Sequence, residues 1–249
     1  MLTTLLGGRA FAEKFGAGPA RVVALHGWGR SRADWLSTLE GYDALALDLP
    51  GFGATPAPQT GWSTQEYAAH VAEVLAGLDR PVLVGHSFGG RVAVQLAARS
   101  PELVRGLVLT GVPLLRPAAT HSSRPPLTYR LARTLHRRGI LSADRMEALR
   151  RQRGSADYNA AQGVLREVLV KAVNEDYTSQ LEAVGAHAVP VAMVWGEHDS
   201  AAPLAMARTA TRLLGGRADL VVVPGSAHLL DDALVAQLRL SVDRLAAAG

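Results

Sequence analysis

The sequence of 249 residues contains no cysteine, which excludes disulfide bonds, a thiol nucleophile and a cysteine-ligated metal site. Lysine is nearly absent too, because only Lys14 and Lys171 occur and the other basic residues are arginines. The net charge of +4 therefore comes from arginine, whose excess can simply reflect genome composition. Basicity of this kind is poor evidence for nucleic-acid binding, and we expect no nucleic-acid partner.

Long apolar runs are also missing. No segment has the ~20 consecutive uncharged, apolar residues that a membrane span requires. Residues 1–16 lack the basic region and the long apolar region of a secretory signal. We therefore expect a cytoplasmic protein without stable membrane insertion. Because 48% of the residues are hydrophobic, the chain can bury a sizeable core, either as one large α/β domain or as a domain with an insertion.

Short apolar runs alternate with helical patterns along most of the chain. The predicted strands are Arg9–Phe15, which fits an edge strand, Arg21–Leu25, Tyr42–Leu47, Pro81–Val84, Leu103–Thr110, Pro190–Trp195 and Asp219–Val223. The predicted helices are Ala33–Leu39, Thr64–Leu78 with a capping box from Ser63 to Glu66, Arg91–Ala98, Pro203–Leu214 and Asp231–Ala247. This alternation predicts an α/β fold, with a mostly parallel sheet and helices on both of its faces.

The alternation stops between Pro113 and about His187. Helical patterns occur there without a convincing strand, near Leu127–Arg138, Ser142–Arg153, Ser155–Val173 and Asn174–Val184. We interpret residues 113–187 as a helical cap, or lid. The core would then be formed by residues 1–112 and 188–249.

The stretch VLVGHSFGG, residues 82–90, predicts a strand, a sharp turn and a helix in immediate succession. It contains the pattern G-x-S-x-G, in which glycines two residues before and after the serine leave room for a strained turn. The pattern alone occurs often by chance, but this context supports Ser87 as a nucleophile. The backbone N–H of Phe88, at the start of the helix, can point at a developing negative charge.

A serine nucleophile needs a general base, because its hydroxyl is unreactive until an imidazole takes the proton. Of the eight histidines, His228 is favoured, since it follows the last predicted strand, where side chains gather at the carboxyl edge of a parallel sheet. His26 is expected to be structural, with its ring bonded to nearby backbone, and His86 to point away from Ser87. Four others fall on helices or in the cap: His70, His121, His136 and His187.

The imidazole in turn needs a carboxylate to hold its tautomer. Asp199 lies just beyond the penultimate strand, and Glu197, nearer the strand, is the rival acid. Asp231 and Asp232 fit the first turn of the last helix, where negative charge is favourable. His198 beside Asp199 has no third ligand at suitable spacing, so we expect no metal site.

A second oxyanion donor is expected from the turn HGWG, residues 26–29. Gly27 and Gly29 flank Trp28 and allow a substrate to approach its backbone N–H. Taken alone, the motif indicates only a glycine-rich turn. Together with the predicted nucleophile, base and acid, it supports an oxyanion hole formed by the N–H groups of Trp28 and Phe88.

The sequence resembles the α/β-hydrolase fold family over nearly its whole length, through HGWG, DLPGFG, GHSFGG, WGEHD and PGSAH in the family's order. The resemblance implies a cofactor-free hydrolase with a triad of Ser87, His228 and Asp199, oxyanion donors Trp28 and Phe88, and a helical cap inserted after the sixth strand. A serine nucleophile departs from the epoxide hydrolases and haloalkane dehalogenases of the family, which need a carboxylate. Small carboxylesterases, such as the pimeloyl-[acyl-carrier protein] methyl ester esterases, look most similar, and C–C bond hydrolases are similar in outline.

Charge is concentrated in the predicted cap. From Leu114 to Thr178 there are twelve Lys or Arg and six Asp or Glu, a net +6. These residues either form solvated helix faces or attract an anionic substrate or an acidic carrier protein.

We therefore expect a serine hydrolase that cleaves a small-molecule carboxylic ester or thioester, neutral, anionic or carrier-bound, through an acyl-enzyme. One alternative is a C–C bond hydrolase of a β-diketone-like substrate with the same triad. Another is a ligand-binding homologue without turnover, because fold does not fix function. The sequence leaves the oligomeric state open.

Overall fold

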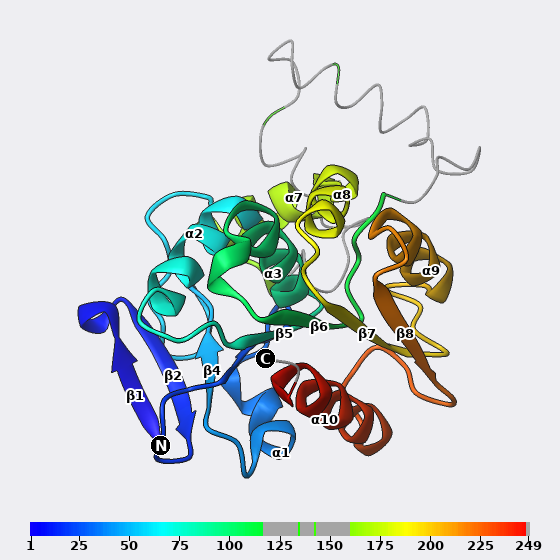
Figure 1. Cartoon of the computed structure of the whole chain (residues 1–249). Coiled ribbons are helices and arrows are strands. Elements are labelled where there is room, and N and C mark those ends of the chain that lie inside the picture. The colour runs from blue at the N-terminus through cyan, green and yellow to red at the C-terminus, as the bar shows by residue number, and fades with distance from the viewer. Residues whose placement is uncertain (117–133, 135–141, 143–159, 248–249) are drawn as a thin grey trace.

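A computed structural model of the chain describes residues 1–116, 134, 142 and 160–247. Within them, eight strands form one sheet in the order β1-β2-β4-β3-β5-β6-β7-β8 (Figure 1). The strands are β1 (Leu2–Leu5), β2 (Ala10–Phe15), β3 (Val22–Leu25), β4 (Ala44–Asp48), β5 (Val82–His86), β6 (Gly106–Thr110), β7 (Val191–Gly196) and β8 (Ala218–Val223). Strands β3 to β8 run parallel to one another, whereas β2 pairs antiparallel with both β1 and β4.

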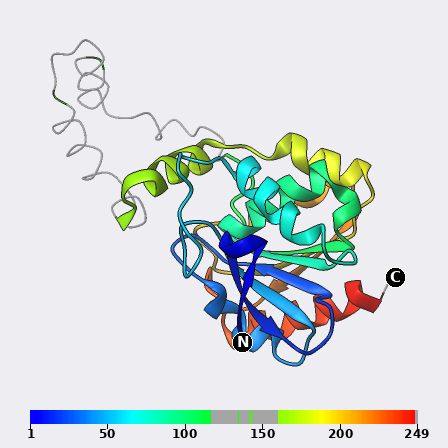
Figure 2. The ribbon, with the colours of Figure 1, turned by 90° about the vertical axis from the view of Figure 1, so that its left-hand side faces the viewer.

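Helices cover both faces of this sheet, which confirms the predicted fold class. They are α1 (Leu36–Leu39), α2 (Thr64–Leu75), α3 (Phe88–Arg99), α7 (Gly163–Asn174), α8 (Thr178–Ala186), α9 (Leu204–Leu213) and α10 (Asp232–Ala247). Figures 1 and 2 show α2, α3, α7 and α8 on one side of the sheet and α10 on the other. Among the described residues, no helix is long and apolar enough to cross a membrane.

The central strands are buried along their whole length, because both faces of the sheet are covered. Every residue of β3, β4, β5, β6 and β7 is buried. Such strands read in the sequence as continuous apolar runs, which explains why they could be predicted. Since β3 and β5 to β8 are parallel, the loops that follow them lie along the same edge of the sheet.

Two predicted strands differ from the observed ones. Arg9–Phe15 is predicted as an edge strand, but β2 is internal because β1 pairs outside it, with Leu2 opposite Glu13. The strand predicted from Leu103 begins only at Gly106, because Pro101–Leu103 form a short 3-10 turn. The capping box at Ser63 and Glu66 is confirmed at the start of α2.

The predicted cap is only partly described. The helices predicted at Leu127–Arg138 and Ser142–Arg153 fall largely outside the described residues. Those predicted at Ser155–Val173 and Asn174–Val184 correspond to α7, which begins at Gly163, and α8. The sixth strand, β6, precedes the insertion as expected. The division into a core of residues 1–112 and 188–249 and a cap of residues 113–187 stays a prediction.

Arg91, on α3, joins two parts of the predicted cap to the core, its first residue and the helix α7. Its Nε donates to the Pro113 carbonyl oxygen at 2.8 Å, and its Nη1 donates to the Ala172 carbonyl oxygen at 2.6 Å. Its guanidinium also lies over the ring of Tyr177, 5.8 Å from the ring centroid. Burial lowers the pKa of Arg91. The chain leaving β6 and the end of α7 are thus both held by the helix that follows Ser87.

We expect Arg91→Met to lower the free energy of unfolding by about 2 kcal/mol. The variant keeps an apolar stem of similar length but leaves two carbonyl groups without their donor. The matched control is Arg99→Met on the exposed end of the same helix, which should change stability by less than about 0.5 kcal/mol. Urea unfolding followed by circular dichroism measures both, and equal effects would contradict the role assigned to Arg91.

Candidate active site

Ser87 lies at the sharp turn between β5 and α3, as the sequence predicts. Its backbone angles are φ 49° and ψ −112°, a strained conformation for a residue with a side chain. A Cβ at Gly85 would lie 2.5 Å from the Gly90 Cα, and one at Gly89 would overlap the Leu25 carbonyl oxygen. The glycines therefore let strand and helix approach closely enough to form this turn.

The loops after β7 and β8 bring two predicted residues to Ser87. His228 Nε2 lies 3.2 Å from Ser87 Oγ, and His228 Nδ1 lies 2.9 Å from Asp199 Oδ2. Because a carboxylate only accepts hydrogen bonds, Nδ1 carries the imidazole proton and Nε2 can accept the serine proton. The structure thus places Ser87, His228 and Asp199 in one chain of hydrogen bonds.

The Asp199 carboxylate is held firmly in its orientation. It is buried, and its Oδ1 accepts hydrogen bonds from the N–H groups of Ala201 at 2.9 Å and Ala202 at 2.8 Å. Gly111, just after β6, has a φ of +57°, and a Cβ there would lie 3.0 Å from Asp199 Oδ2. Our sequence reasoning missed Gly111, although a glycine directly after a buried strand was a signal that could have found it.

The predicted oxyanion donors are backbone N–H groups at the start of α3 and in the HGWG turn. The N–H of Phe88 is at the start of α3, and the N–H of Gly89 donates to the His26 carbonyl oxygen at 3.0 Å, which ties the HGWG turn to this helix. Within the part of the chain that the structure describes, the N–H groups of Trp28 and Phe88 have no acceptor. The Trp28 and Phe88 rings meet edge to face, with centroids 5.3 Å apart.

The rival acids bind elsewhere. Glu197 is half exposed and accepts a hydrogen bond from the Gly225 N–H at 3.2 Å. Asp231 accepts from Ser226 Oγ at 3.0 Å and from the Leu234 N–H at 2.8 Å, so it caps α10 as expected. No three His, Asp or Glu side chains gather as a possible metal site among the described residues.

The other histidines are accounted for as follows. His26 is buried between the Gly27 carbonyl oxygen, 2.7 Å from Nδ1, and the Leu49 N–H, 3.0 Å from Nε2, which confirms its structural role. Burial lowers the pKa of His26. His86 contacts the backbone of His228, a contact that the sequence did not reveal. His70 lies on α2 and His187 at the end of α8, whereas His121 and His136 lie outside the described residues.

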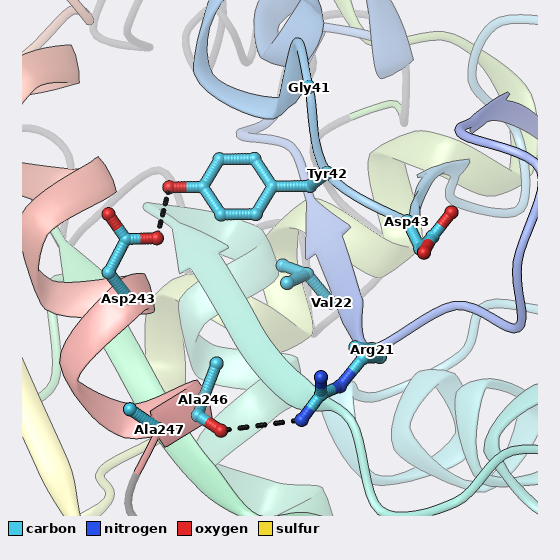
Figure 3. Close-up of a pocket in the computed structure, with 8 residues that line it drawn as sticks. All are labelled: Arg21, Val22, Gly41, Tyr42, Asp43, Asp243, Ala246 and Ala247. Atoms are coloured by element: carbon cyan, nitrogen blue, oxygen red, sulfur yellow. Dashed lines mark hydrogen bonds between the residues drawn. The ribbon is translucent and has the colours of Figure 1, made fainter.

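A cavity of about 520 Å³ lies at the opposite edge of the sheet (Figure 3). It is lined by residues that precede β3 and β4 or belong to these strands and α10: Arg21, Val22, Gly41, Tyr42, Asp43, Asp243, Ala246 and Ala247. A hydrogen bond of 2.7 Å joins Tyr42 to Asp243 across it. Because Ser87 follows the carboxyl end of β5, this cavity is separate from the candidate active site.

We expect Gly89→Ala to destabilise the protein by about 2 kcal/mol, because its Cβ would collide with the backbone at Leu25 and His26. Gly77→Ala is the matched control, since a Cβ at Gly77 meets nothing within 4 Å. Thermal unfolding of both variants measures the difference. A Gly89→Ala protein as stable as the control would show that the close approach does not constrain the turn.

Comparisons with known proteins identify the family of the chain. The sequence model of the alpha/beta hydrolase family matches residues 22–238. The chain is 29% identical over 223 residues to the biotin biosynthesis bifunctional protein BioHC of Cellvibrio japonicus, covering 83% of this chain and 43% of that protein. It is 40% identical over 101 residues to the pimeloyl-[acyl-carrier protein] methyl ester esterase of Aeromonas hydrophila, covering 39% of each. The chain thus spans less than half the length of these curated relatives.

Solved structures share the fold over nearly the whole chain. The crystal structure of E-2-(acetamidomethylene)succinate hydrolase superposes with a TM-score of 0.70 at 22% identity, covering 98% of both chains. A monoacylglycerol lipase of Paleococcus ferrophilus superposes with a TM-score of 0.65 at 21% identity, covering 96% of this chain and 99% of the lipase.

Proposed function

Because the chain belongs to the alpha/beta hydrolase family, we propose that it cleaves carboxylic esters with Ser87 as nucleophile. The observation that carries this proposal is the hydrogen-bonded chain from Ser87 through His228 to Asp199, at 3.2 Å and 2.9 Å. Three side chains from three separate loops meet in the order that serine activation requires. A protein that only binds a ligand has no need of this arrangement.

The proposed reaction proceeds through an acyl-enzyme. Ser87 Oγ attacks the ester carbonyl carbon while its proton passes to His228 Nε2. Asp199 keeps the Nδ1 proton in place and stabilises the positive imidazolium. When the tetrahedral intermediate collapses, the C–O bond to the alcohol breaks and the alcohol leaves with the proton from His228. Water, deprotonated by His228, then attacks the acyl-enzyme. As the bond to Ser87 Oγ breaks, His228 returns this proton to Ser87 Oγ and the carboxylic acid is released.

The N–H groups of Trp28 and Phe88 would bind the negative oxygen of the tetrahedral intermediate. Both lack an acceptor within the described chain, so they need not give up a protein hydrogen bond to take on this role. Phe88 also begins α3, where the helix dipole favours negative charge. Each such donor is typically worth roughly a hundredfold or more in rate.

We expect Ser87→Ala to lower kcat on p-nitrophenyl esters by about 10⁴-fold or more, because no other group replaces the nucleophile. A series from acetate to laurate would also give the preferred acyl length. The control is Ser179→Ala, an exposed serine on α8, which should keep full activity.

If the wild-type protein cleaves no ester, labelling with a fluorophosphonate shows whether Ser87 is nonetheless a reactive nucleophile. Folded wild-type protein that does not label at Ser87 would overturn the proposal. Labelling without turnover of any ester would instead favour C–C bond hydrolysis with the same triad.

Two observations support an anionic or carrier-bound ester as the substrate. The sequence from Leu114 to Thr178 has a net charge of +6, and one relative is named as an esterase of an acyl-carrier-protein ester. We propose that this basic region attracts the substrate, which would raise the association rate in a salt-dependent way.

The test is a double variant, Arg137→Glu with Arg138→Glu, assayed on one neutral and one acidic-tailed ester. Both arginines lie in the predicted cap and outside the described residues. We expect kcat/KM to fall severalfold for the acidic ester at low salt, and the loss to shrink as salt is added. The control with the same change in charge is Arg21→Glu with Arg217→Glu, at the opposite edge of the sheet. Equal losses on both esters would remove the steering role.

A further inference from the structure

His86, the last residue of β5, contacts the backbone of the proposed base. It is only 2% exposed, and its Nε2 lies 2.9 Å from the His228 carbonyl oxygen. A carbonyl oxygen only accepts, so Nε2 carries the proton and donates this hydrogen bond. The two imidazole rings are close as well, with centroids 4.9 Å apart.

The other ring nitrogen of His86, Nδ1, makes no stabilising interaction with the described residues. Nδ1 is buried and has no hydrogen-bond partner within the described residues. It faces Gly27, where a Cβ would lie 2.8 Å from it. An unpaired buried acceptor destabilises a folded protein, and an apolar ring of similar size would avoid that cost. The feature that distinguishes histidine from such a ring here is its hydrogen bond to His228.

His86 can donate this bond without opposing the charge on His228. Burial is the main cause that lowers the pKa of His86 to about 4, and the nearby charge of His228 lowers it further. Its hydrogen bond to the His228 carbonyl and the carboxylates of Asp34 and Asp199 act in the opposite direction. The His86 ring is therefore uncharged at neutral pH, also when His228 has taken the serine proton.

We propose that His86 is a positioning residue, which holds His228 in place in the acyl-enzyme, while Ser87 carries the acyl group. The inference rests on the proposed function. In the free enzyme, two hydrogen bonds tie His228 to the Ser87 turn: its Nε2 contacts Ser87 Oγ, and its carbonyl oxygen accepts from His86. In the acyl-enzyme, Ser87 Oγ has no proton to donate, so the first bond is lost. Asp199 still holds the ring through Nδ1, and the bond from His86 then holds the backbone of His228 so that the imidazole stays where it can activate water.

The proposal predicts different effects on the two steps of the reaction, acylation and deacylation. Loss of the His86 donor should slow deacylation more than acylation, because only acylation starts with the Ser87–His228 bond in place. We expect His86→Phe to lower the deacylation rate about tenfold or more, as small misplacements of a catalytic group can do. His86→Gln keeps an N–H donor of similar reach and should restore most of the rate, whereas the shorter His86→Asn should not.

Stopped-flow release of p-nitrophenol gives both rates, since the initial burst reports acylation and the steady phase reports deacylation. His70→Phe is the matched control, because His70 is also buried with an unpaired ring nitrogen but lies on α2 beside Trp62. It should leave both rates unchanged. Thermal unfolding of each variant shows whether a lower rate is merely a loss of folded protein.

Each outcome decides the proposal. A larger burst relative to the steady rate in His86→Phe, reversed in His86→Gln, supports it. Equal slowing of both phases, or no difference between the Gln and Asn variants, overturns it. If His86→Phe does not fold, the Gln and Asn pair alone decides. Failure of the wild-type protein to label at Ser87 would instead overturn the proposed function, and this inference with it.

Discussion

The close approach of β3, β5 and α3 around Ser87 is the constraint on which the rest of the site depends. Leu25 pairs with Gly85 across the two strands, and the Gly89 N–H donates to the His26 carbonyl oxygen at 3.0 Å. This packing supports the positive φ of Ser87, which costs on the order of 1–3 kcal/mol. The same contacts fix the distance between the HGWG turn and the start of α3. The same backbone packing therefore positions the proposed nucleophile and the proposed oxyanion donors.

The remaining groups reach Ser87 because of the order of the strands. Asp199 follows β7 and His228 follows β8, and β6 lies between these strands and β5. Gly111, at the end of β6, leaves space for the Asp199 carboxylate and the His228 ring. Asp199 and His228 thus lie in loops that begin at the ends of β7 and β8, and the sheet fixes where both loops start. The proposed chemistry depends on parallel strands that end at the same edge of the sheet.

The sequence predicted those features that short patterns determine. Glycine spacing around Ser87 identified the turn, and the positions of Asp199 and His228 after apolar runs placed them at the same edge. It could not predict features that depend on distant parts of the chain. Strand β1 is a strand because it pairs with β2, and the bond from His86 to His228 joins residues 142 positions apart. The sequence likewise predicted Arg91 only as part of a helix, without its hydrogen bonds to Pro113 and Ala172.

The two hydrogen bonds of Arg91 to the predicted cap have an evolutionary consequence. Pro113 and Ala172 bond to the same guanidinium, so the two ends of the intervening chain are held by the core itself. The entropic cost of closing a loop rises only slowly with the length of the loop. A change in the number of residues between Pro113 and Ala172 should therefore alter the free energy of folding only slightly. We expect insertions, deletions and substitutions between Pro113 and Ala172 to leave the position of Ser87 unchanged. We therefore expect substrate preference to diverge among descendants of this protein while the proposed triad is inherited unchanged.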